Sequence, residues 1–396
     1  MASPLIQEKL AQAKRHLEEF NVECWITFVR ETALNGDPVL PFLVESDLTW
    51  HSAFIVTARH AYAIVGQYDR QAVLDVGAYD EVIGYVKGIK EHLLRVLQQL
   101  DPKTIAVNYS RGSEICDGIT HGMYLTLRDM LYEIDMQDRL ISAEKIVSAL
   151  RARKTSSEVE NIIQAIRLTE RIFDETARFI APGKTEREIA AFMKQRVAEA
   201  GVQYAWDPRT CPAVFTGPET AEAHYAPTDR AVQRGHVLNI DFGLKVNGYC
   251  SDLQRTFYVA EEGEHVAPPE VQRGFATIVQ AIELARGTMR AGVQGIEADT
   301  IARRYITEAG YPEFLHALGH QVGRFAHDGT ALLGPAWGKY AQKPFQTLES
   351  GMVFTIEPRL PVARRGIVTI EEMVVVKETG AEFLSTPQKE LFLVAS

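Results

Sequence analysis

The chain has little of several features that define particular protein classes. It has four cysteines in 396 residues, none in a C-x-x-C spacing, which excludes a disulfide scaffold and favours buried thiols in a reducing compartment. It has no run of about 18 apolar residues, so no transmembrane helix is expected. Its 52 acidic residues outnumber 42 basic ones, and the net charge of -10 argues against binding to nucleic acid or to an anionic membrane surface.

The first twenty residues lack the apolar centre of a signal peptide. They have the pattern of an amphipathic helix with charges throughout, so we expect a cytoplasmic protein. What the chain does contain is ordinary for a globular protein, with 46% hydrophobic and 24% charged residues. At about 100–200 residues per domain, its length predicts two domains.

The first 150 residues predict a mixed α/β domain without a catalytic motif. Short apolar, β-branched runs alternate there with helical patterns. The expected helices are Ile6–Phe20, Ile89–Leu100 and Gly122–Leu131, and the expected strands are Cys24–Val29, Ala53–Thr57, Ala61–Val65, Val82–Val86 and Thr104–Asn108. The polar stretch RARKTSSEVE marks a boundary, so we expect domains at residues 1–150 and 151–396.

The second domain begins with helix-start signals and contains an internal echo, meaning a sequence segment that occurs twice in similar form. Thr155–Glu158 and Thr185–Glu188 fit capping boxes, in which a hydroxyl and a glutamate satisfy free backbone N–H groups. The stretch 183–201 resembles the stretch 292–310, since both begin and end with glycine and carry a glutamate, Glu188 or Glu297, at the same offset. The echo predicts two related halves that share a sheet, with a pocket between them.

Four carboxylates interrupt apolar strand patterns in this second domain. Asp241 and Asp252 lie on two strands joined by an Asn247–Gly248 turn, so both acids should approach one centre. Glu357 and Glu371 each follow a Thr-Ile pair in a β-branched run. A buried acid is unfavourable unless it is paired or binds a metal ion. One such acid could merely cap a turn, but four together favour a site.

Three histidines complete the candidate site. His316, His320 and His327 fall within one short, glycine-punctuated stretch, which favours a site over a single packed histidine. Carboxylates with one imidazole form a hard ligand set that suits Mn²⁺, Fe²⁺ or Co²⁺ and, less exclusively, Zn²⁺. Two divalent ions would neutralise four carboxylates, so we expect a dinuclear site.

In this order, these residues resemble the metallopeptidases of the pita-bread fold, family M24, which include methionine aminopeptidase, aminopeptidase P and prolidase. The segments PGKTE, TGPETAEAHYAP and LESGMVFTIEP support the resemblance, which is close over residues 150–396. The first 150 residues resemble the N-terminal domain of the prolidase, aminopeptidase P and creatinase branch. The resemblance implies an α/β N-terminal domain, with a mixed sheet and flanking helices, before an α+β pita-bread catalytic domain with pseudo-two-fold halves.

The resemblance also implies a role for each metal ligand. Asp241 would bind one metal ion, Asp252 and Glu371 would bridge two, and His320 and Glu357 would bind the second. Mn²⁺ is the most expected ion, with Co²⁺, Fe²⁺ or Zn²⁺ as alternatives. A metal-bridging hydroxide would be the nucleophile, and Glu357 would carry a proton to the leaving amine.

Other residues would handle the substrate by the same resemblance. His327 would position it and stabilise the tetrahedral intermediate, His224 would line the pocket, and His316 would lie near the proline subsite. Thr256 would contact Asp252 on the side away from the metal and help to orient it. The implied substrate is a small peptide with proline at its second position, and the implied assembly is a homodimer.

Several alternatives stay open at this point. The enzyme could cleave Xaa-Pro dipeptides or the Xaa-Pro N-termini of longer peptides. The same fold also hosts a carbon–sulfur lyase and amidine hydrolases, so another reaction on the metal site, or a non-catalytic binding role, is an alternative.

Two departures from the family pattern bear on specificity. Many relatives carry an arginine where this chain has Thr369, and a glycine where it has Arg359. Arg359, Arg364 and Arg365 could meet a substrate carboxylate or could be solvated loop charges.

Overall fold

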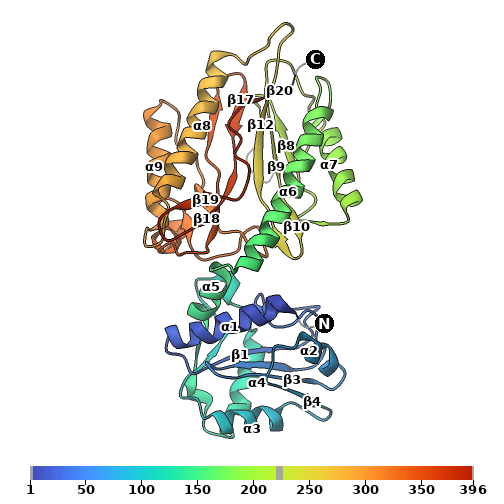
Figure 1. The fold of residues 1–396 in the computed structure, drawn as a ribbon, viewed down its shortest axis with the longest axis vertical. Coiled ribbons are helices and arrows are strands. Elements are labelled where there is room, and N and C mark those ends of the chain that lie inside the picture. Colours follow the sequence, from blue (N-terminus) through green and yellow to red (C-terminus); the bar gives the residue numbers. More distant parts are fainter. Residues whose placement is uncertain (1–2, 220–225, 395–396) are drawn as a thin grey trace. The chain divides into compact units, whose positions relative to one another are not determined.

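The computed structural model describes residues 3–219 and 226–394 (Figure 1). The chain divides into two compact units, residues 1–151 and residues 152–396. Within the described residues, every helix is too short or too polar to cross a membrane.

The first unit is built on a six-stranded mixed sheet with the order β4-β3-β2-β1-β5-β6. Its strands are β1 (Cys24–Val29), β2 (Ser52–Val56), β3 (Ala61–Gly66), β4 (Glu81–Tyr85), β5 (Ile105–Val107) and β6 (Leu140–Ser142). The pairs β1–β2 and β2–β3 are antiparallel, whereas β1–β5, β3–β4 and β5–β6 are parallel. This mixture of pairings requires helices that connect the parallel strands.

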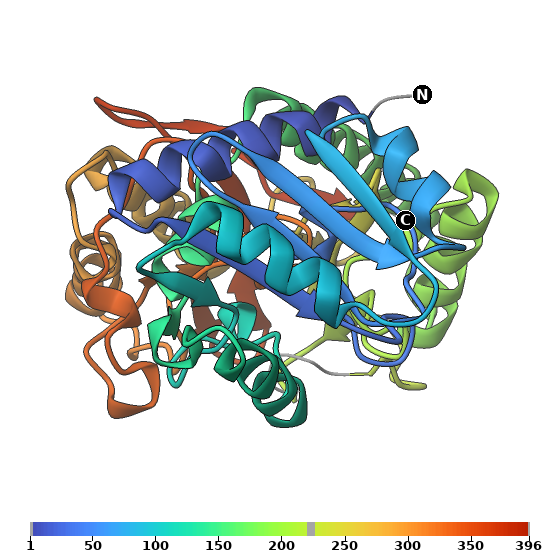
Figure 2. The ribbon, with the colours of Figure 1, turned by 90° about the horizontal axis from the view of Figure 1, so that it is seen from below.

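Helices cover both faces of this sheet. They are α1 (Pro4–Glu19), α2 (Arg70–Val76), α3 (Lys90–Leu100), α4 (His121–Tyr132) and α5 (Glu144–Ala152), with short 3₁₀ turns at Leu40–Phe42, Glu114–Cys116 and Gln137–Arg139. Alternate residues of β1 separate into two apolar cores: Trp25 packs with α1, α2 and α5, and Ile26 packs with α3 and α4. Figure 2 shows α1 and α4 on opposite sides of the sheet.

All of the helices and strands expected for residues 1–150 are present, with ends shifted by at most two residues. The helices α2 and α5 and the short strand β6 were not expected from the sequence. Only Val73 and Val76 of α2 are buried, so its apolar pattern is too short to stand out.

Over its described residues, 152–219 and 226–394, the second unit has four long helices and several small sheets. The helices are α6 (Ser156–Phe179), α7 (Glu186–Ala200), α8 (Pro269–Thr288) and α9 (Gly295–Glu308). A four-stranded sheet has the order β20-β12-β9-β8, formed by β20 (Phe392–Val394), β12 (Leu253–Val259), β9 (Val237–Phe242) and β8 (Ala213–Thr216). A three-stranded sheet has the order β15-β18-β19, formed by β15 (Val353–Ile356), β18 (Glu372–Val376) and β19 (Ala381–Phe383).

Three smaller groups of strands lie in the described part of the unit. The first pairs β10 (Leu244–Val246) with β11 (Tyr249–Cys250) and β7 (Gln203–Tyr204). The others pair β13 (Gly319–His320) with β14 (Leu332–Leu333), and β16 (Arg359–Val362) with β17 (Gly366–Thr369). Two 3₁₀ turns lie at Gly338–Tyr340 and Lys343–Phe345.

The internal echo of the sequence corresponds to matching local structure. α7 and α9 both begin with a capping box, closed by Glu188 in one and Glu297 in the other. Gly183 and Gly292, which precede these helices, have nearly equal positive φ angles of 89° and 90°. Each capping residue also forms an isolated β-bridge, Thr185 to Ala231 and Gln294 to Thr347. The two segments therefore fold alike.

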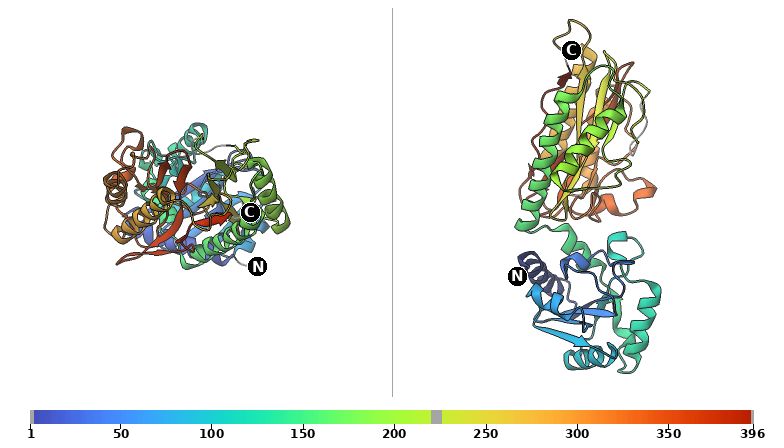
Figure 3. Two further views of the ribbon diagram at one scale, coloured as in Figure 1. Left: turned by 90° about the horizontal axis from the view of Figure 1, so that it is seen from above. Right: turned by 90° about the vertical axis from the view of Figure 1, so that its right-hand side faces the viewer.

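The two helix pairs lie against different strands. α6 and α7 contact β8 and β10, whereas α8 and α9 contact β14, β16 and β17 (Figure 1). In the right-hand view of Figure 3, the green α6 and α7 lie in front of the yellow strands β9 and β12. The fold thus matches the expected pair of halves with strands between the helix pairs.

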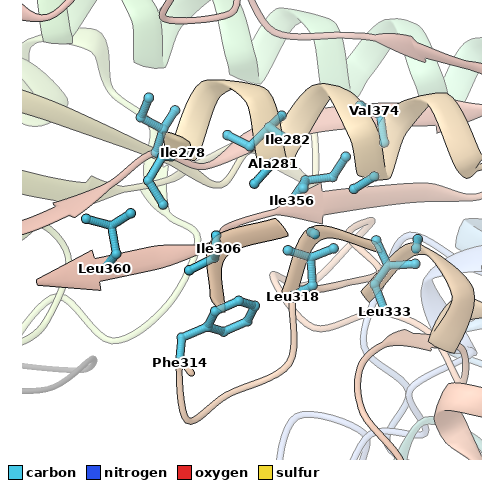
Figure 4. Close-up of a cluster of buried hydrophobic side chains, with 14 of the residues drawn as sticks. Ile278, Ala281, Ile282, Ile306, Phe314, Leu318, Leu333, Ile356, Leu360 and Val374 are labelled. Atoms are coloured by element: carbon cyan, nitrogen blue, oxygen red, sulfur yellow. The ribbon is translucent and has the colours of Figure 1, made fainter. Parts of the chain in front are cut away.

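A single apolar cluster supports the second half. Ile278, Ala281 and Ile282 of α8 face Ile356 and Val374 of β15 and β18 (Figure 4). Burial of such side chains stabilises the fold by about 1.5–3 kcal/mol each. This core fixes β15, which ends just before Glu357, and β18, which begins just after Glu371.

Candidate metal centre

Asp241 and Asp252 lie on the same face of one antiparallel strand pair. In the pairing of β9 with β12, Asp241 is directly opposite Gln254. Asp252 precedes Gln254 by two residues, so strand alternation places it on that face too. The chain turns at Asn247 and Gly248, whose φ angles of 50° and 78° suit a tight hairpin, as predicted.

Glu371 reaches the site through the same glutamine. It forms an isolated bridge with Gln254, and the two residues exchange backbone hydrogen bonds of 3.4 and 3.2 Å. Its neighbour Glu372 points the other way, where its carboxylate pairs with the buried Arg255 at 3.2 Å. Only the first glutamate of the pair therefore faces the carboxylates of β9 and β12.

His320 and Glu357 enter from a neighbouring strand group. The backbone N–H of His320 donates to Thr355 Oγ1 at 3.1 Å, and the N–H of Glu357 donates to the carbonyl of Leu318 at 2.7 Å. A Cβ on Gly319 would lie 2.0 Å from the carbonyl oxygen of Thr355. The absence of a side chain at Gly319 thus allows β13 to approach β15 closely enough to align the histidine with the glutamate.

The imidazole of His320 is the centre of the cluster. Its Nε2 lies 3.4 Å from Glu357 Oε1, 3.8 Å from Asp252 Oδ2 and 3.9 Å from Glu371 Oε1. Ligand atoms of Asp252, His320 and Glu371 all lie within 4.8 Å of one another. Atoms from three separate strand groups therefore converge at a spacing that one cation could span.

The electrostatics of the metal-free cluster are unfavourable. Burial raises the pKa of Asp241 to about 7, against some lowering by Arg359. Burial and then the charge of Asp241 raise the pKa of Glu357 to about 8. The pKa values of Asp252 and Glu371 lie well above the ordinary range, first from burial and then from neighbouring carboxylates. Such acids gain most from a bound cation.

One further observation fits a cation. Asp241 Oδ1 is buried and has no hydrogen-bond partner among the described residues. A buried carboxylate oxygen without a partner is unfavourable, and a metal ion would satisfy it. The donor set of four carboxylates and one imidazole is the hard set that Mn²⁺, Fe²⁺ and Co²⁺ accept.

Of the histidines predicted for the substrate, the structure describes His327 and His316. The ring of His327 lies 4.1 Å from that of His320 in an edge-on arrangement. His316 Nδ1 lies 2.7 Å from the carbonyl oxygen of Ala317. Its pKa is lowered to about 4, mainly by burial, and the charge of Arg359 also lowers it. His224 lies outside the described residues.

Thr256 was expected to support Asp252. Its hydroxyl forms hydrogen bonds of 2.7 Å with Asn239 Oδ1 and 2.6 Å with the carbonyl of Thr369. It therefore ties β12 to β17, and its support of Asp252 stays a prediction.

Two residues near the centre were not identified from the sequence: Gln254 and Thr355. Gln254 Nε2 donates to Glu357 Oε2 at 3.3 Å and to Glu371 Oε2 at 3.0 Å. Its place two residues after Asp252 in an apolar strand is a signal that could have revealed it. Thr355 has no such signal, because its role depends on the strand that packs beside it.

The three arginines of the C-terminal strands differ in position. Arg359 is half-buried and lies opposite Thr369 in the pairing of β16 with β17. Its charge lowers the pKa values of Asp241, Glu357 and His316. Arg364 is exposed, and Arg365 pairs with Glu270 at 3.1 Å. Among these three, Arg359 is thus the arginine whose charge reaches the site.

The raised pKa values predict how the metal-free protein responds to pH. The folded carboxyls hold protons that the unfolded chain releases above its ordinary values of 3.8 and 4.5. Their contribution to stability is therefore complete below those values and is lost as pH rises through about 7 to 8. We expect the melting temperature of chelator-treated protein to fall steadily over this range.

Saturating Mn²⁺ should remove most of this decline, because the cations stabilise the ionised carboxylates. Thermal melts of both forms in one buffer series measure the difference. Parallel curves with and without Mn²⁺ would show that the cluster is not a cation site.

Comparisons with known proteins agree with this geometry. Residues 160–378, more than half of the chain, match the model of metallopeptidase family M24. The Xaa-Pro dipeptidase of Pyrococcus furiosus is 32% identical over 250 residues, which cover 63% of this chain and 67% of that protein. The putative Xaa-Pro aminopeptidase of Mycoplasma genitalium is 29% identical over 289 residues, covering 70% and 76%.

A solved structure extends the likeness to both units. The X-Pro aminopeptidase of Thermotoga maritima aligns with a TM-score of 0.74 and 28% identity, over 96% of this chain and all of that chain. The expected fold, an α/β N-terminal domain followed by a pita-bread catalytic domain, is thereby confirmed. The protein is a metallopeptidase, and the chain belongs to metallopeptidase family M24.

Proposed function

We propose that this metallopeptidase hydrolyses the peptide bond before proline, in Xaa-Pro dipeptides or at Xaa-Pro N-termini, with two divalent metal ions. The proposal rests on one observation above all: His320 Nε2 lies within 3.4–3.9 Å of carboxylate oxygens from three segments. The names of the relatives, a Xaa-Pro dipeptidase and Xaa-Pro aminopeptidases, supply the substrate class.

Five residues would hold the ions: Asp241, Asp252, His320, Glu357 and Glu371. One divalent ion would leave two of the four carboxylate charges uncompensated, whereas two ions neutralise the set. Ligand atoms of Asp252 and Glu371 lie within 4.8 Å of each other, a spacing at which both carboxylates could contact one cation. Mn²⁺ is our first choice, with Co²⁺, Fe²⁺ or Zn²⁺ as alternatives.

When bound, the ions would lower the pKa of a coordinated water and polarise the scissile carbonyl. The protein's own side chains would transfer protons and bind the substrate. Glu357, whose Oε1 lies 3.4 Å from His320 Nε2, would move a proton from the attacking water to the leaving nitrogen of proline. His327, whose ring lies against His320, would donate a hydrogen bond to the developing oxyanion. His224 would contact the substrate.

Hydrolysis assays test the proposal. We expect chelated protein to be inactive toward Xaa-Pro peptides and Mn²⁺ or Co²⁺ to restore cleavage. Asp252→Ala should lower kcat/KM by more than about 100-fold, because a ligand matters more than the groups that support ligands. Asp174→Ala, on the exposed side of α6, is the matched control and should retain full activity.

The outcomes separate the alternatives. If neither a dipeptide nor a tripeptide is cut while the protein still binds metal tightly, the peptidase proposal fails. Another reaction on the same site, a lyase or amidine hydrolase reaction, then becomes the leading idea. If the protein binds no metal, the proposed site itself is wrong.

The position of Arg359 favours dipeptides. Arg359 lies two residues after Glu357 and opposite Thr369, and its charge lowers the pKa of His316, the residue expected beside the proline. We infer that its guanidinium pairs with a free proline carboxylate. We expect Arg359→Ala to raise the KM for a Xaa-Pro dipeptide by about tenfold or more, as for loss of a charged hydrogen bond. The KM for a Xaa-Pro-Xaa tripeptide should change little, because its carboxylate lies one residue further on.

Arg364→Ala is the control, since this exposed arginine lies in the same strand pair's turn. An equal rise in KM for both peptides in Arg359→Ala would contradict carboxylate recognition. It would leave Arg359 as a charge that acts on the metal ligands alone.

A further inference from the structure

The carboxamide of Gln254 lies between two of the proposed metal ligands. Its Nε2 donates to Glu357 Oε2 at 3.3 Å and to Glu371 Oε2 at 3.0 Å. Gln254 is 9% exposed, and its backbone is fixed to β9 on one side and to Glu371 on the other. One amide group therefore holds two carboxylates that arrive from different strands.

These hydrogen bonds decide which oxygen atoms remain for a cation. The amide occupies the Oε2 atoms of both glutamates, and the Oε1 atoms face His320 Nε2 at 3.4 and 3.9 Å. Without the amide, either carboxylate could rotate about its terminal bond, because that torsion has a broad energy minimum. The amide thus fixes the donor edge that each glutamate presents.

Thr369 fixes the amide in turn. Its hydroxyl lies 3.0 Å from Gln254 Oε1 and 3.2 Å from the carbonyl oxygen of Pro358, so its one proton is shared between these two acceptors, and Thr369 is 2% exposed. The hydroxyl of Thr256 bonds both the N–H and the carbonyl of Thr369, at 3.2 and 2.6 Å. With the amide reversed, its carbonyl oxygen would face two carboxylate oxygens, and their repulsion excludes that orientation.

A neutral donor suits this place. A lysine or arginine between the glutamates would also orient them, but its charge would compete with a cation for the same carboxylates. The amide orients both and leaves their charge available.

We propose that Gln254 is a positioning residue for the metal centre and that Thr369 sets its orientation, so that the pair raises the affinity of the His320 side of the site for a divalent ion. This inference rests on the metal site of the proposed function. It assigns a role to Thr369, at a position where relatives carry arginine, as part of a neutral hydrogen-bond chain.

Calorimetric titration of Mn²⁺ into chelator-treated full-length protein tests the pair. Gln254→Met keeps the side-chain volume and removes both donors, and we expect the affinity to fall by about 10–100-fold. Thr369→Val should lower it in the same direction, whereas Thr369→Ser should restore it. The double variant should bind no more weakly than Gln254→Met alone, because both changes break one chain of bonds.

Gln12→Met is the matched structural control. This buried glutamine of the first unit accepts a hydrogen bond from Lys9 Nζ at 2.7 Å, so its loss should lower the melting temperature without changing the Mn²⁺ affinity.

The outcomes are distinct. If the parent protein binds no Mn²⁺, the proposed function fails. If the parent binds it and Gln254→Met and Thr369→Val bind it equally well, only the positioning role is overturned. If Thr369→Ser does not restore binding, the hydroxyl is not the orienting group and the proposal is overturned as well.

Discussion

Mutual repulsion among buried carboxylates is the constraint on which the second unit depends. The β9–β12 pair brings in Asp241 and Asp252, the β15–β18 pair brings in Glu357 and Glu371, and burial raises the pKa of each of these acids. A fold gains nothing from such a cluster by itself, because desolvation and like charge both oppose it. We infer that the surrounding strands and helices hold these carboxylates at positions where cations can bind them.

That frame is built from rigid elements. The α8 and α9 core fixes β15 and β18, which end and begin beside Glu357 and Glu371. The six-residue pairing of β9 with β12 fixes the two aspartates. Close approach at Gly319 then sets His320 against Thr355. The ligands therefore come from strands whose positions are fixed by pairing and packing.

Much of this arrangement could be predicted from local patterns. The Asn247–Gly248 turn identifies the hairpin, strand alternation identifies the shared face, and capping boxes mark the starts of α6 and α7. The same rules miss residues whose role arises only from packing between distant segments. Gln254 was not identified, and Thr369 was noted only as a departure from the family pattern, yet the two side chains meet across β12 and β17. Nothing in the local sequence of either strand specifies that meeting.

Diffraction from Mn²⁺-loaded crystals at the manganese absorption edge tests the central claim most directly. The account predicts two anomalous peaks in the second unit, one beside Asp241 and one beside His320 and Glu357, with Asp252 and Glu371 contacting both. Absence of any peak at these side chains in Mn²⁺-loaded, active protein would contradict it, as would strong peaks held by other residues.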